Sequence, residues 1–167
     1  IFAGRITGRM LGLGMSPPSM ALPLGPLPLQ FVGAAFIAVA VAISNGAGAR
    51  IVLVSAGLSV VAWVGYTGAS AVGFEVAAAS GVGAFLGSFI GMVVAYRLHV
   101  PSVAVTTAAI LPMVPGAAVF RGLLGIVESG DDAAVLMTGV TTLAGAATIG
   151  IALAVGASLG IYLGQPV

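Results

Sequence analysis

Charged residues are scarce in this 167-residue sequence: only 5% of its residues are Asp, Glu, Lys or Arg, and lysine does not occur. Soluble domains typically contain about 25% charged residues, so this chain cannot cover a water-exposed surface. A net charge of +1 leaves no basic face for nucleic acid. With 60% hydrophobic residues and a mean hydropathy of +1.24, the sequence predicts an integral membrane protein.

Cysteine is also absent, which excludes disulfides, thiol nucleophiles and cysteine metal sites. One histidine and four carboxylates, three of them in one loop, suggest no metal site. The segment GASLG, Gly156–Gly160, matches a nucleophile elbow, but it lies in an apolar helix without suitable Asp and His partners. We therefore expect no metal, no cofactor and no enzymatic activity.

Long apolar runs dominate what is present. A spanning helix needs about 20 apolar residues, and barrel strands would alternate apolar with polar positions, which these runs do not. The sequence predicts an all-α integral membrane protein, a bundle of about five transmembrane helices. The expected spans are residues 27–44, 51–70, 76–98, 101–127 and 134–163. The last is long enough to tilt, to extend past the bilayer or to be interrupted at a glycine.

Residues 1–26 have a different character, with several prolines and no continuous helical pattern. We interpret them as a linker from a missing upstream half, and residues 27–167 as the membrane-embedded half. Arginine tends to stay on the cytoplasmic side, which places the turns at Arg50 and Arg97 and the C-terminus in the cytoplasm. Arg5 and Arg9 then lie outside, against this rule.

Glycine is abundant, with 26 residues, and it recurs at every fourth position in two of the runs. Such ridges let helix backbones approach closely in lipid. They can form a sliding or dimer surface or provide tight packing within one bundle, and we favour packing. The two ridges are Gly83, Gly87 and Gly91, and Gly156, Gly160 and Gly164.

Two prolines and a glycine break the fourth apolar run. Pro112 and Pro115 each lack the amide hydrogen that a helix interior requires, Val114 is pushed away from helical angles, and Gly116 permits almost any angle. Pro-x-x-Pro-Gly therefore predicts an interruption, which the membrane tolerates only where backbone lines a cavity or is buried in protein. Many transporters build substrate sites at broken helices, and free amides beginning the second half-helix suit a carboxylate.

Polar residues near this break are candidate ligands. Arg121 could neutralise a substrate carboxylate, or it could extend to the interface or pair with Glu128. Threonine usually bonds to its own helix, but a cluster facing a broken helix could coordinate a polar solute. The candidate substrate-binding residues are Pro112, Pro115, Gly116, Arg121, Thr106, Thr107, Thr138, Thr141 and Thr142.

The run VPSVAVTTAAILPMVPGAAVFRGLLGIV, followed by a threonine-bearing last helix, resembles the C-terminal membrane half of the threonine/serine exporter family. It also resembles the small subunit of a two-component bacterial succinate exporter. The resemblance covers about residues 26–162, and the arrangement P-x-x-P-G-x(4)-R carries it. It implies export of small amino or carboxylic acids by proton antiport across a bacterial plasma membrane, with an N-terminal half fused upstream or supplied separately.

Two alternatives stay open: a dicarboxylate exporter subunit of the same architecture, and a non-transporting membrane scaffold or assembly subunit. The expected partners are the acid substrate, protons, the missing half and the lipid bilayer, with a homo-oligomer possible and no nucleic acid. Glu75, which hydropathy places at a turn, is the one carboxylate that could approach mid-membrane. The proton site is therefore expected in the missing half.

Overall fold

The computed structural model describes residues 25–130 and 132–165, so the linker expected over residues 1–26 lies almost entirely outside the described part. The chain divides into two units between Gln30 and Phe31. In the first, the side-chain amide of Gln30 donates to the carbonyl of Gly25 at 2.6 Å. All packing described below lies within the second unit.

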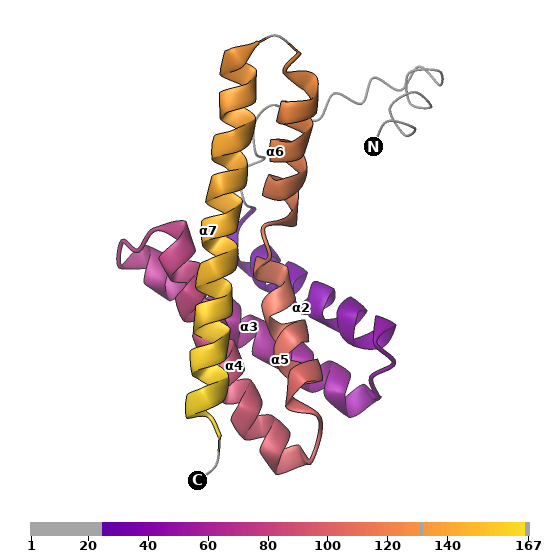
Figure 1. The fold of residues 1–167 in the computed structure, drawn as a ribbon. Helices are drawn as coiled ribbons and strands as arrows, with labels where there is room; N and C mark the ends of the chain where they lie inside the picture. Colours follow the sequence, from indigo (N-terminus) through magenta and orange to yellow (C-terminus); the bar gives the residue numbers. More distant parts are fainter. Residues whose placement is uncertain (1–24, 131, 166–167) are drawn as a thin grey trace. The chain divides into compact units, whose positions relative to one another are not determined.

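Helices and one 3-10 turn make up the regular structure of the described residues (Figure 1). The all-α membrane bundle predicted from hydropathy is confirmed. Four helices are long and apolar enough to cross a membrane, or five spans if the bent pair that ends at Glu128 counts as one. The elements are α2 (Leu27–Ser44), α3 (Ala49–Ala71), α4 (Val76–Leu98), α5 (Ser102–Ile110), η1 (Leu111–Met113), α6 (Gly116–Glu128) and α7 (Ala133–Leu163).

Glycines of α4 bring it against α3. A Cβ on Gly83 would lie 2.6 Å from the carbonyl oxygen of Ala62, and one on Gly87 would lie 2.9 Å from the Ala62 Cβ. Gly91 contacts Leu58 further along, so the two helices run antiparallel. The α4 ridge is therefore occupied by contacts within the bundle.

The second glycine ridge packs α7 on the other side of α4. A Cβ on Gly156 would collide with the carbonyl of Gly81, and one on Gly160 would lie 2.5 Å from the Phe85 carbonyl oxygen. Gly164 meets Phe89 one turn later, so α4 and α7 run in the same direction. These contacts confirm the prediction of tight packing within one bundle.

The helix α7 is an uninterrupted helix of 31 residues, about 46 Å long at 1.5 Å per residue. Its first turn is capped by Asp132, whose carboxylate accepts from the amides of Ala134 and Val135 at 2.9 and 3.3 Å. Of the possibilities for this long run, interruption at a glycine is wrong, because helical hydrogen bonding continues through every one.

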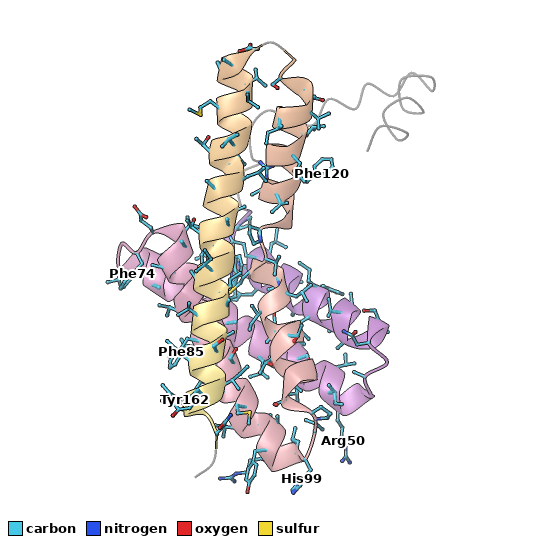
Figure 2. All side chains as sticks on the ribbon, viewed as in Figure 1. Arg50, Phe74, Phe85, His99, Phe120 and Tyr162 are labelled. Carbon is cyan, nitrogen blue, oxygen red and sulfur yellow. The ribbon has the colours of Figure 1, made fainter. Side chains whose placement is uncertain are left out.

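Two turns that carry basic residues lie at one end of this unit. Arg50 opens α3 and His99 ends α4, and both are found at the same end in Figure 2. His99 adopts a left-handed conformation with φ of 54°, in which its amide bonds to the Tyr96 carbonyl and closes the helix. The arrangement agrees with the grouping of the Arg50 and Arg97 turns on one side.

Candidate functional site

The fourth apolar run is broken where the sequence predicts it. The helical segments on either side of Val114 and Pro115 are bent by 50° relative to each other. Val114 leaves the helical region, with φ −64° and ψ 126°, as expected for a residue before proline. The break therefore follows directly from the two prolines.

Hydrogen bonds at the break replace only some of the helical hydrogen bonds that the two prolines remove. Because Pro115 has no amide hydrogen, the carbonyl of Leu111 accepts instead from the amide of Val114 at 3.1 Å. The Gly116 amide bonds to the Val114 carbonyl at 2.8 Å, and α6 makes its first helical bond from Val119 to Pro115.

Two amides at the start of α6 have no backbone acceptor, either in α6 or in the break before it. They belong to Ala117 and Ala118, which precede the first helical bond from Val119. A helix N-terminus of this kind attracts negative charge, because its free N–H groups and its dipole point the same way. The start of α6 is therefore suited to a carboxylate.

Met113, which lies between the two prolines, anchors the break to the bundle. It is buried in a cluster with Ala62, Ala84 and Leu153. Its Cε lies 2.6 Å from the position that a Cβ on Gly83 would occupy, so the methyl group fills the space that glycine leaves free. Since Gly83 lies in the first half of α4, the break sits alongside that span and not at its end.

The opposite side of the break is open. Val114 is 54% exposed, Gly116 is exposed, and a Cβ on Gly116 would meet no atom within 4 Å. Pro112 and Pro115 are half-buried. The described residues therefore supply one wall of a site at this break and leave the other side uncovered.

Arg121 lies on α6, five residues past the break. It is half-buried, and its Nε donates to the carbonyl of Ala117 at 3.2 Å. The guanidinium is thus folded back along its own helix toward the end that carries the free amides. This geometry adds positive charge near the start of α6.

The two threonines before the break differ in their surroundings. Thr106 is buried, its hydroxyl donates to the Ser102 carbonyl at 2.8 Å, and its methyl packs 3.1 Å from the Cβ position of Gly91. Thr107 is exposed on α5. Thr106 therefore contributes to the contact between α4 and α5, whereas Thr107 is open to a solute.

The three candidate threonines of α7 bond to their own helix. The hydroxyl of Thr138 donates to Ala134, that of Thr141 to Met137 and Thr138, and that of Thr142 to Thr138, at 2.7–3.0 Å. Their neighbour Gly139 packs on Gly122 and Gly125, so they lie level with the middle of α6. The structure does not bring them to the break.

Sequence reasoning missed Met113 and Trp63, which pack in the same cluster. Trp63 lies on α3 and packs against the cluster that contains Met113, and its indole nitrogen is buried without a hydrogen-bond partner. A methionine between two prolines was a visible signal, but its partner Gly83 lies thirty residues away. The glycine gave no indication by itself, because several glycines of α4 have the same spacing.

Apolar helices packed through glycine around a discontinuous span define a multi-pass α-helical membrane protein. Residues 30–162 match the family described as Threonine/Serine exporter, ThrE. The chain belongs to this family.

A curated relative supports the assignment. A protein of Mycobacterium tuberculosis named "Probable threonine/serine exporter" is 36% identical over 157 residues, which cover 89% of this chain. The aligned part spans only 28% of the relative's length. No solved structure shows a significant match to this chain.

Proposed function

We propose that this chain is the membrane half of a secondary transporter that exports small amino acids such as threonine and serine. The observation that carries the proposal is the break between α5 and α6, which leaves two amides free beside an arginine. Family membership supports the substrate class, since the matched family and relative are described as threonine/serine exporters.

The break suits the carboxylate of an amino acid. The free amides of Ala117 and Ala118 can donate to its oxygens, and Arg121 supplies a positive charge within the same helix. Thr107, exposed on α5, is the candidate partner for the substrate's polar groups. Discontinuous helices bind anionic substrate groups in this manner in several transporter folds.

The open side of the break requires a second wall, because a substrate in the membrane must be shielded from lipid. The chain spans 28% of the length of its curated relative. We infer that a second polypeptide half, fused or separate, closes the site and carries the proton-coupling group. Export from the cytoplasm then proceeds by proton antiport across the bacterial plasma membrane, with Arg50 and the C-terminus on the cytoplasmic side.

Counterflow in proteoliposomes that contain the complete exporter tests the substrate class. Internal unlabelled threonine or serine should drive accumulation of labelled threonine, while succinate should not. Accumulation of labelled succinate against internal unlabelled succinate, without accumulation of labelled threonine, would instead support a dicarboxylate exporter. Absence of counterflow with every amino or dicarboxylic acid would support a membrane scaffold.

Arg121→Ala should lower threonine counterflow by about tenfold or more, since a hydrogen bond to a charged group contributes roughly 1.5–3 kcal/mol. Arg121→Lys keeps the charge and should retain more activity. Because Arg121 is only half-buried and bonds within its own helix, both variants should reach the membrane at normal levels. Unchanged transport in Arg121→Ala would exclude the arginine from the site.

A further inference from the structure

A ridge of small residues follows α7 from its first turn to Gly164, the residue that caps its C-terminus. Its members recur at intervals of three or four residues. Those from Ala134 to Ala152 lie on one side of the helix, and each of the three glycines that follow is turned about 40° further around it. We call this series of residues the α7 ridge. It comprises Ala134, Thr138, Thr141, Gly145, Thr148, Ala152, Gly156, Gly160 and Gly164.

Only the second part of the α7 ridge has a partner among the described residues. Gly156, Gly160 and Gly164 are buried against α4, whereas every ridge member from Ala134 to Thr148 is exposed. The change follows from helix length: α4 begins at Val76, only five residues before the Gly81 contact. The first half of α7 therefore extends beyond the start of α4.

The exposed part of the ridge is distinct from the face that packs on α6. That other face carries Gly139 and Leu143, and Leu143 lies 2.7 Å from the Cβ position of Gly122. Figure 1 shows α6 alongside the first half of α7. Gly145, by contrast, has no atom within 4 Å of its Cβ position.

A groove runs along the contact between α4 and α7 and reaches the exposed part of the ridge at Thr148. It has a volume of about 510 Å³ and lies between α4 and α7. Gly81, Ala152 and Gly156 line it, and Thr148 is its polar lining residue. The α4–α7 interface is thus bordered by an apolar groove that reaches the exposed part of the ridge at Thr148.

The chemistry of the exposed ridge favours a helix as its occupant. The hydroxyls of Thr138, Thr141 and Thr148 already bond to carbonyls of α7, so no polar partner is required. Flexible lipid chains need no run of small residues. Close approach of two helix backbones is favoured by one, and the glycines that continue this ridge are used in this way against α4.

We propose that the exposed part of the α7 ridge, from Ala134 to Thr148, binds a membrane-spanning helix of the second half of the exporter. This identification of the partner rests on the proposed two-half function. The curated relative has ample chain for such a helix, because the part aligned here spans only 28% of its length. The continuity with the α4–α7 interface places that helix beside α7, at the groove.

Photo-crosslinking in the complete exporter tests this contact. The photoreactive residue p-benzoylphenylalanine is introduced at Gly145 or, as a control, at Ala147. Both positions are exposed, but two residues of helix turn them about 200° apart. After irradiation of native membranes, mass spectrometry identifies the partner of each adduct. Differently tagged copies of the chain distinguish contacts between two copies.

The expected result is an adduct from Gly145 to exporter polypeptide outside residues 27–163, with only lipid adducts from Ala147. An adduct between Gly145 and residues 27–163 of a differently tagged copy would overturn the proposal in favour of a homo-oligomer. Lipid adducts from both positions, or equal polypeptide adducts from both, would also overturn it. Threonine counterflow on the same preparation separates the proposed contact from the proposed exporter function. A crosslink without threonine transport refutes only the exporter function. Threonine transport without the crosslink refutes only the contact.

Discussion

At the scale of single residues, Gly83 holds the break in place by having no side chain. The Met113 methyl group and the Ala62 carbonyl each lie 2.6 Å from its Cβ position. Methionine adapts to an irregular space, but the carbonyl belongs to the backbone and cannot move as easily. The position of the break in the bundle therefore depends on a residue thirty positions away in the sequence.

Gly83→Ala should destabilise the protein by about 1–3 kcal/mol, because overpacking forces side chains and backbone to shift. Gly57→Ala is the matched control, since its Cβ would meet nothing within 4 Å and alanine favours helix by roughly 1 kcal/mol. Thermal unfolding in detergent measures both. An equal melting temperature for Gly83→Ala and the wild type would contradict the described packing.

Single-residue contacts were also the least predictable from the sequence. The self-bonding of the α7 threonines could be predicted, because threonine in a helix usually reaches a carbonyl three or four residues earlier. The contact between Met113 and Gly83 could not, because it depends on how α3, α4 and the break come together. Thr106 likewise proved to be a packing residue, which its sequence neighbourhood did not indicate.

At the scale of elements, the local sequence determined where most of the helices begin and end and where the fourth span breaks. Hydropathy predicted the bounds of α2 and α4 to the residue, and Pro112, Pro115 and Gly116 predicted the interruption between α5 and α6. The glycine spacing predicted ridges but not their partners. Which helix each ridge meets is a property of the tertiary fold, so only the structure pairs Gly156 with Gly81 and Gly83 with Ala62.

Replacing both prolines should straighten the broken span. In Pro112→Ala/Pro115→Ala, the missing amide donors return, and a continuous helix replaces the 50° bend. The absence of cysteine in this chain allows spin labels at Ser102→Cys and Val127→Cys. The separation of their backbone positions should approach about 37 Å, the length of 25 residues of continuous helix at 1.5 Å of rise per residue. Gly116→Ala should leave it unchanged, and an unchanged separation in the double variant would show that packing, not proline, makes the bend.

At the scale of the whole molecule, the second unit is a helix bundle in which two packing surfaces are only partly covered. The break is covered by α4 on one side and exposed on the other, and the α7 ridge is packed along one part and exposed along the rest. Composition and hydropathy predicted the membrane class and five spans. The open surfaces could not be predicted from the sequence, because a helix that is apolar on every face does not indicate which face meets lipid and which meets protein.

We propose that the start of α6 binds the exported acid, and Gly116→Leu tests this binding most directly. Its side chain enters open space, so the fold should be retained, but it would cover the free amides of Ala117 and Ala118. Threonine counterflow in proteoliposomes should fall by about tenfold or more, given the strength of hydrogen bonds to a carboxylate. Gly57→Leu, which also enters open space but lies on α3, should transport normally. Full counterflow by folded Gly116→Leu would contradict the account.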